Sequence, residues 1–238
     1  MSEANLLAEW ARLLLGSLAA AGVREVVVSP GARSTPFVCA AHAEPQLRCW
    51  DVIDERAAAF FALGQARVTG RPSLLICTSG TAGAHYLPAV IEAGAAHLPL
   101  LVLTADRPFE LQDCGAPQTI DQIKLLGGHA RRFFELGMPD PSDLSLRALR
   151  RLAAQAVLTT TWPTPGAVHL NARARKPLEP QSVHTSDEVA LRARVDELLQ
   201  APLLRAYPPR AVPAPAGVAA AAQLCRSARR GLIICGPA

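Results

Sequence analysis

The sequence predicts an α/β fold in which helices cover both faces of a doubly wound, mostly parallel sheet, giving three layers. Short β-branched and apolar runs, such as 24–28, lack a polar face, which is typical of strands buried between two helical layers. These runs alternate along the chain with longer segments in which Leu and Ala recur at helical spacing. With 238 residues, half of them apolar, the chain is long enough to bury such a core.

The first half of the chain predicts a regular alternation of helix and strand. A helix over 5–21 ends at Gly22, which suits a C-terminal cap, and the strand over 24–28 follows at once. The same pattern predicts three more helices and three more strands, which are helices 35–43, 55–69 and 81–93 and strands 48–53, 73–77 and 100–103. Because a helix separates most neighbouring strands, these connections favour parallel pairing.

The pattern is less regular in the second half of the first domain. A loop is followed by a predicted helix over 120–126 and a predicted strand over 132–136. Ser142 then caps a helix over 143–158. A strand over 167–171 closes the domain.

The remaining residues predict a change of domain. We divide the chain into a first domain over 1–185, a linker over 186–215 and the beginning of a truncated second α/β domain over 216–238. The linker contains five prolines and one short amphipathic segment, 187–199, and we expect it to cross an outer surface. The final segment again predicts a helix, over 218–229, followed by a strand and a glycine within 231–236.

Composition and charge disfavour several classes of function. The net charge is only +4, and the arginines are scattered with few aromatic residues near them, which disfavours nucleic-acid binding. The six cysteines form no C-x-x-C pair and have no zinc-like spacing with the histidines, so we expect buried thiols and no metal site. The acidic N-terminus is unlike a signal peptide, and no apolar run is long enough for a membrane span. We therefore expect a cytoplasmic protein.

Four loops that follow predicted strands carry the polar residues of most interest. They are SPGARSTP at 29–36, DER at 54–56, TSGTAG at 78–83 and TADRP at 104–108. In an open parallel sheet, ligands bind beyond the carboxyl ends of the strands. We therefore expect the four loops to face one crevice.

Each loop alone has an ordinary structural explanation. A proline–glycine pair forms turns, a helix dipole favours an acidic first residue, and a glycine-rich turn is weak evidence for anion binding. TSGTAG matches neither the P-loop nor the dinucleotide-binding pattern. The combination is more informative, because packing does not require Arg33 and Arg107 beside a loop that carries Gln118. Two guanidinium groups suit a dicarboxylate, and Glu55 suits a nitrogen heterocycle.

These motifs resemble the N-terminal, pyrimidine-binding domain of thiamine diphosphate-dependent enzymes. DERAAAFFALG followed by TSGTA is shared in looser form with thiamine diphosphate decarboxylases and acetohydroxyacid synthases. SPGARSTP, LTADRPFEL and GAPQ are narrower, and they are similar to motifs of the 2-succinyl-5-enolpyruvyl-6-hydroxy-3-cyclohexene-1-carboxylate synthases, the MenD family of menaquinone biosynthesis. On this resemblance, the first domain is the pyrimidine-binding domain and the last segment begins a central domain.

The resemblance implies a cofactor and a role for several residues. Thiamine diphosphate would be the cofactor. Glu55 would be the catalytic residue, which hydrogen-bonds N1′ of the aminopyrimidine ring and tunes its proton chemistry. Pro30, Thr78, Ser79 and Gly80 would form part of the wall around that ring.

The resemblance also implies two substrates. The reaction would decarboxylate 2-oxoglutarate and add the resulting succinyl carbanion equivalent to isochorismate. Arg33, Arg107 and Gln118 would hold the carboxylates of isochorismate, which orients the substrate as well as binding it. Ala32 lies in the same loop where the family commonly has serine, so one hydroxyl near the substrate is lost.

Part of the implied site lies outside this sequence. The GDG motif followed by asparagine, which would bind Mg²⁺ and the diphosphate, is not found here and would belong to a further domain. The family places its cofactor between subunits, so the active unit would be a homodimer or homotetramer. We therefore expect this chain alone to be inactive, and to pair with itself through the helices that follow Glu55 and Thr81.

Three alternatives remain open at this point. The first is another thiamine diphosphate enzyme, such as an acetohydroxyacid synthase or an oxoacid decarboxylase, although neutral substrates give Arg33 and Arg107 little purpose. The second is a non-catalytic binding or dimerisation module, which should not bind isochorismate. The third is a nucleotide-binding doubly wound domain, which the lack of a phosphate-loop glycine pattern disfavours.

Overall fold

The computed structural model of the chain describes residues 2–209 and 212–234, and its main feature is a six-stranded sheet. All pairings in this sheet are parallel, and the strand order is β2-β1-β3-β4-β6-β5. The strands are β1 (Glu25–Val28), β2 (Arg48–Asp51), β3 (Ser73–Cys77), β4 (Leu100–Asp106), β5 (Arg132–Glu135) and β6 (Ala167–Arg173). The predicted α/β fold class is confirmed.

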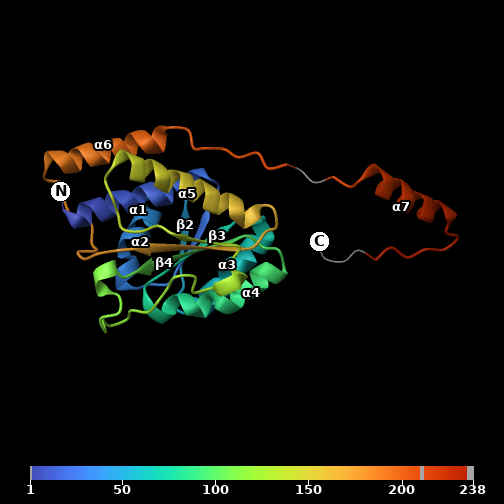
Figure 1. Ribbon diagram of the computed structural model, residues 1–238, viewed down its shortest axis with the longest axis horizontal. Coiled ribbons are helices and arrows are strands. Elements are labelled where there is room, and N and C mark those ends of the chain that lie inside the picture. Colours follow the sequence, from blue (N-terminus) through green and yellow to red (C-terminus); the bar gives the residue numbers. More distant parts are fainter. Residues whose placement is uncertain (1, 210–211, 235–238) are drawn as a thin grey trace. The chain divides into compact units, whose positions relative to one another are not determined.

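Helices cover both faces of the sheet (Figure 1). The α-helices are α1 (Glu3–Ala20), α2 (Thr35–Ala43), α3 (Glu55–Thr69), α4 (Leu87–Ala95), α5 (Asp143–Thr161), α6 (Ser186–Gln200) and α7 (Pro215–Ser227). Side chains of α1, α2 and α5 pack in one apolar core with one face of the sheet, and side chains of α3 and α4 pack in a second core with the other face. The central strands β3, β4 and β6 are buried along their whole length, as expected for strands that helices cover on both faces.

Capping residues explain why several bounds could be predicted. α3 begins after Asp54, whose side chain accepts a hydrogen bond from the Ala57 N–H, and it ends at Gly70 in the left-handed conformation. α5 begins after Ser142, which accepts from the N–H of Ser145. Its C-terminal end, at Thr161, lies three residues beyond the predicted one.

Two helix predictions were wrong in part or in full. The predicted helix over 81–93 is divided, because Gly80–Tyr86 forms a 3₁₀ helix and the α-helix begins only at Leu87. Pro88 explains the division, since it has no N–H to donate to the carbonyl four residues earlier. The predicted helix over 120–126 is a series of turns, in which Lys124 has a φ of 55° that no α-helix accepts.

The chain separates into two compact units, residues 1–205 and 206–238. α6 packs against α1 within the first unit, and Arg12 of α1 pairs with Asp196 of α6 at 2.6 Å. By these contacts, α6 belongs to the first unit. The domain boundaries expected at residues 185 and 215 remain a proposal.

The second unit contains α7, which lies close to the predicted position for a helix. The predicted strand over 231–236 is wrong for residues 231–234, which form neither helix nor strand, and 235–236 lie outside the described residues. A lone strand has no partner for its backbone groups, which accounts for this outcome. No helix in the described parts of the chain is long and apolar enough to cross a membrane.

Candidate cofactor and substrate site at the strand ends

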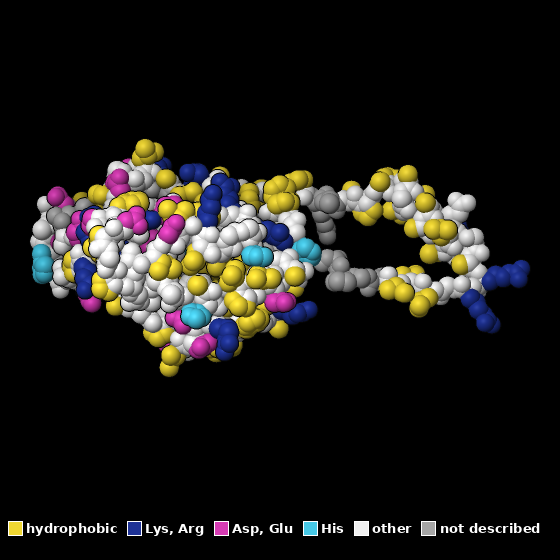
Figure 2. Space-filling view, turned by 60° about the horizontal axis from the view of Figure 1, so that its bottom comes forward, with side chains coloured by type: hydrophobic (Ala, Val, Ile, Leu, Met, Phe, Trp, Pro, Cys, Tyr) yellow, Lys and Arg dark blue, Asp and Glu magenta, His cyan; other side chains and the backbone are white. Residues whose placement is uncertain are grey.

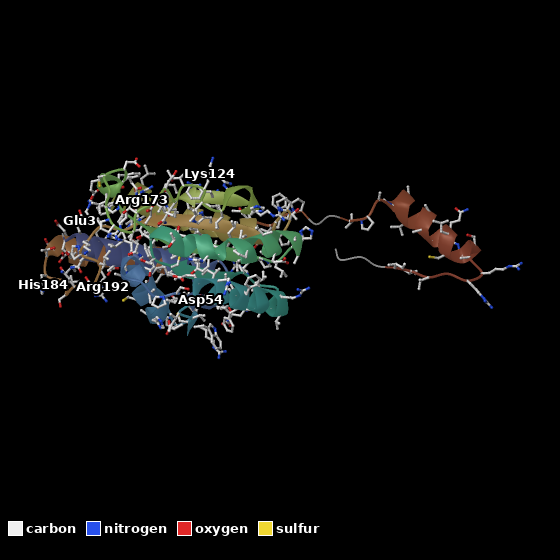
Figure 3. The ribbon with its side chains drawn as sticks, turned by 90° about the horizontal axis from the view of Figure 1, so that it is seen from below. Glu3, Asp54, Lys124, Arg173, His184 and Arg192 are labelled. Atoms are coloured by element: carbon white, nitrogen blue, oxygen red, sulfur yellow. The ribbon has the colours of Figure 1, made fainter. Side chains whose placement is uncertain are left out.

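The four loops singled out in the sequence follow β1, β2, β3 and β4, which are neighbours in the sheet. Because the strands are parallel, all four loops leave the sheet at its carboxyl edge. Figure 3 labels two residues from this edge, Asp54 before α3 and Arg173 at the end of β6. Side-chain contacts join the loops after β1, β3 and β4, directly or through the loop that carries Gln118.

Glu55 is the first residue of α3, directly after the capping residue Asp54. Its side chain is half-buried. Burial is the main cause that raises the pKa of both Cys77 and Tyr86, and the negative charge of Glu55 adds to the rise in each. The Glu55 carboxylate is thus close enough to act on groups at the end of β3, rather than only on solvent.

The loop after β1 is held tightly against the loop after β3. A Cβ atom on Gly31 would lie 2.4 Å from the Cβ of Thr78, so only glycine allows this approach. The backbone N–H of Arg33 donates to Thr78 Oγ1 at 3.3 Å. Pro30 and Ala32 are exposed on the same loop.

The side chain of Arg33 is almost fully buried, with 4% of its surface exposed. Its Nη1 donates to the carbonyl of Ala174, just after β6, at 2.6 Å, while its Nε has no partner among the described residues. Burial lowers the pKa of Arg33, and the positive charge of Arg107 lowers it further. The two arginines that the sequence predicts as substrate ligands therefore lie in one electrostatic environment.

Arg107 is fixed by both its backbone and its side chain. Its N–H donates to Asp106 Oδ1 at 2.7 Å, and its carbonyl accepts from Arg173 Nη1 at 2.8 Å. Its Nη2 donates to the carbonyl of Pro117 at 2.8 Å, which ties the β4 loop to the loop that carries Gln118. The Arg107 guanidinium is thus held in place, and within the described residues it forms no ion pair with a carboxylate.

The Gln118 side chain is hydrogen-bonded to the glycine loop, which is the loop at 78–83. Its Nε2 donates to the carbonyl of Ser79 at 3.1 Å, and the Ser79 hydroxyl donates to the Gln118 carbonyl at 3.2 Å. Gly80 has a φ of 86°, and a Cβ there would lie 2.9 Å from Cγ of Gln118. Gly80 is therefore required both by its backbone conformation and by the close approach of Gln118.

A buried polar chain that sequence reasoning missed supports these loops. Gln122 accepts from the Gly80 N–H at 2.8 Å and donates from Nε2 to Asn171 Oδ1 at 3.0 Å. Thr104 donates its one hydroxyl hydrogen to the same Asn171 oxygen at 2.8 Å. His169 Nε2, 2.8 Å from that hydroxyl, must then be the donor to Thr104. The wrong helix prediction over 120–126 concealed the role of Gln122.

A buried group of ion pairs lies beside these hydrogen-bonded side chains. Arg173 Nη1 is 3.2 Å from Asp106 Oδ2, and Arg173 Nη2 is 3.3 Å from Glu135 Oε2. Asn171 donates to the same two carboxylates, and the Arg173 guanidinium lies over the ring of Phe109. The sequence NAR at 171–173, where β6 ends, is the signal that could have identified this cluster of charged side chains.

The candidate site combines one carboxylate with two close contacts between loops. A half-buried carboxylate lies at a helix start, and two glycines, Gly31 and Gly80, let backbone approach where a Cβ would clash. Within residues 2–209 and 212–234, no group of three or more His, Cys, Asp or Glu side chains is arranged to bind a metal ion. These features fit the pyrimidine part of a cofactor.

The fold and this site define the class as the N-terminal domain of a thiamine diphosphate-dependent enzyme. Residues 8–125 match the family model described as thiamine pyrophosphate enzyme, N-terminal TPP binding domain, which supports thiamine diphosphate as the cofactor.

Similar proteins identify the particular family. The 2-succinyl-5-enolpyruvyl-6-hydroxy-3-cyclohexene-1-carboxylate synthase of Sorangium cellulosum is 55% identical over 238 residues, which is all of this chain and 38% of the relative. The synthase of the same name from Myxococcus xanthus is 47% identical over 99% of this chain and 40% of the relative. That of Geobacillus kaustophilus is 49% identical over 98% of this chain and 39% of the relative. The chain belongs to this synthase family, and it spans about two fifths of the length of these relatives.

Proposed function

We propose that the chain is the N-terminal part of a synthase that decarboxylates 2-oxoglutarate and adds the succinyl carbanion equivalent to isochorismate, in menaquinone biosynthesis. The observation that carries this proposal is identity over the whole chain to synthases of that name, reaching 55%. The coupling of Arg33 and Arg107 supports it, because two adjacent guanidinium groups suit an acidic substrate.

Glu55 is the proposed catalytic residue. Its carboxylate, at the first position of α3, would accept a hydrogen bond from N1′ of the aminopyrimidine ring and so hold a proton at that atom. Bound thiamine diphosphate supplies the carbanion chemistry that protein side chains lack. The exposed Pro30, together with Thr78, Ser79 and Gly80, would shape the wall beside the ring.

Arg33, Arg107 and Gln118 are the proposed isochorismate ligands. The guanidinium of Arg107 has Nη2 engaged with Pro117, and Nη1 is the donor proposed for a carboxylate. Gln118 is held against Ser79, so it would reach a ligand only at the edge of the glycine loop. Ala32, exposed next to Arg33, would contact the substrate through its methyl group alone.

We also propose the groups that would complete the site. Mg²⁺ and the diphosphate would be bound by residues outside this chain, and a homodimer or homotetramer would complete the site. The exposed Phe60, Phe61 and Ile91 on α3 and α4 support pairing through this face. Hydrophobic side chains gather on the surface over these helices in Figure 2. A metabolic role of this kind fits a cytoplasmic location.

A chimera tests the proposal directly. This chain would replace the matching N-terminal 38% of the Sorangium relative, and consumption of isochorismate with 2-oxoglutarate, thiamine diphosphate and Mg²⁺ would be followed. We expect activity in the chimera, none in the 238-residue chain alone, and a loss of about 10²-fold or more in Glu55→Gln. Arg71→Gln, an exposed change after α3, is the matched control and should keep full activity. A folded but inactive chimera would refute the proposal.

The same chimera separates the alternatives. Activity on 2-oxoacids without isochorismate, unchanged in Arg107→Gln, would favour another thiamine diphosphate enzyme. For the proposed function, Arg107→Gln should raise the KM for isochorismate with a smaller effect on the KM for 2-oxoglutarate. A non-catalytic module would give neither activity nor isochorismate binding.

A further inference from the structure

A cavity of about 310 Å³ lies between the C-terminal part of α6 and the exposed side of α5, outside the candidate site. α5 and α6 run side by side there (Figure 1), and Arg194 of α6 pairs with Asp143 of α5. Arg147, Arg150 and Arg151 of α5 line this cavity together with Arg194. Their spacing of three and four residues places the three arginines of α5 on one side of that helix.

The charges around the cavity do not balance. Asp143 pairs with both Arg147 and Arg194, and Glu197 pairs with Arg194. The two carboxylates therefore offset two of the four arginines. The two remaining arginines, Arg150 and Arg151, have only neutral hydrogen-bond partners among the described residues.

Arg150 is the arginine of this cavity whose side chain is held in place by a contact with the residue that follows α6. Its Nη2 donates to the carbonyl of Ala201 at 2.7 Å, which fixes the guanidinium between the two helices. Its Nε is buried and has no partner in the described part of the chain. Burial lowers the pKa of Arg150, and the charge of Arg147 adds to this effect. An anion in the cavity would relieve both the missing partner and the repulsion.

The other wall of the cavity is apolar. It consists of residues near the end of the first compact unit, namely Leu198, Ala201, Pro202, Leu203 and Leu204. A ligand that fits both walls carries a charged oxyanion at one end and an apolar group at the other. Two unbalanced positive charges match a doubly charged group, and several arginine donors match the oxygens of a phosphate.

We propose that this cavity binds a small organic phosphate, with the phosphate against Arg150 and Arg151 and the apolar group against the leucines and Pro202. This site is separate from the loops at the carboxyl edge of the sheet. Its ligand is therefore independent of the proposed synthase reaction.

Calorimetric titration of the 238-residue chain with phenyl phosphate, at pH 8 and constant ionic strength, tests the proposal. We expect one saturable site, with weaker binding of inorganic phosphate because it lacks the apolar group. Arg150→Gln should weaken phenyl phosphate binding by about tenfold or more, since charge-assisted hydrogen bonds are lost. Arg151→Gln changes an exposed residue, so it should weaken binding without affecting the fold.

Arg71→Gln, which removes one exposed charge elsewhere, is the matched control and should leave the affinity within about twofold. Three results would overturn the proposal. They are the absence of saturable binding at millimolar phenyl phosphate, equal weakening by Arg71→Gln, and equal affinity for phthalate, which would make the ligand a dicarboxylate instead.

Discussion

Nη1 of Arg173, at the end of β6, donates to the carbonyl oxygen of Arg107 at 2.8 Å, and it also lies 3.2 Å from Oδ2 of Asp106. One buried guanidinium thus holds the backbone of a proposed substrate ligand and neutralises the carboxylate beside it. The backbone of Arg107 is thereby anchored to the buried end of β6.

Replacing Arg173 should have a large effect on stability. Arg173→Met leaves Asp106 buried without its charged partner, and only 1% of Asp106 is exposed. We expect the free energy of unfolding to fall by about 3–5 kcal/mol in urea titrations. The control is Arg175→Gln, where an exposed pair with Glu110 is lost and solvent screening should make the cost much smaller. Equal costs in the two variants would contradict the buried ion pair.

Gln122 should control the order of the glycine loop. Gln122→Leu leaves the Gly80 N–H without its acceptor, at a cost of about 1–3 kcal/mol. Amide hydrogen exchange should show faster exchange at Gly80 than in the unaltered chain. Gln46→Ala changes an exposed glutamine far from this loop in the sequence, and it should leave that rate unchanged. Unchanged protection of Gly80 in Gln122→Leu would show that this bond does not hold the loop.

Two glycine-to-alanine changes should have opposite signs. Gly80→Ala forces a side chain into a left-handed conformation and against Gln118, so it should lower the melting temperature. Gly64→Ala lies within α3, where a Cβ meets no atom within 4 Å, and it should stabilise the chain by about 0.5–1 kcal/mol. Thermal unfolding of both variants measures this difference. A neutral Gly80→Ala would contradict the close approach described for the loop.

His169 should make stability depend on pH. The His169 side chain is buried, and burial lowers its pKa from 6.5 to about 4. Between these values the unfolded chain binds a proton that the folded chain refuses, so stability falls as the pH falls from about 6.5 to 4. The loss attributable to His169 should reach about 3 kcal/mol at the lower limit.

Urea unfolding at several pH values, in the unaltered chain and in His169→Gln, would measure this effect. Glutamine can still donate to Thr104, so the variant should fold, and its stability should depend less on pH across this window. The control is Gln46→Ala, a change at an exposed side chain that carries no charge, which should keep the pH dependence of the unaltered chain. Identical pH profiles for His169→Gln and the unaltered chain would show that His169 does not titrate as described.

The sequence allowed the sheet and most of its helices to be predicted because the signals are local. The β-branched strands, the Asp54 cap and Gly70 each act within a few residues. The 120–126 segment could not be predicted in this way, because Gln122 takes its partners from Gly80 and Asn171, far away in the sequence. Turns fixed by such distant contacts have no periodic pattern to detect.

The same distinction applies to the candidate site. The positions of Glu55, Arg33 and Arg107 could be predicted because each follows a strand, whereas their roles toward ligands remain proposals. Arg173 also ends a strand, yet its partners Asp106 and Glu135 come from two other strands. Only the strand order brings these three together, and that order is a property of the whole sheet.

The contact between Gly31 and Thr78 restricts how this protein could acquire a new specificity. Any larger residue at position 31 would push apart the loop proposed for the acidic substrate and the loop proposed for the cofactor. A designer, or natural selection, would therefore do better to vary outward-facing neighbours such as Ala32, where a new side chain displaces nothing. Changes at such positions would leave the two joined loops unaltered.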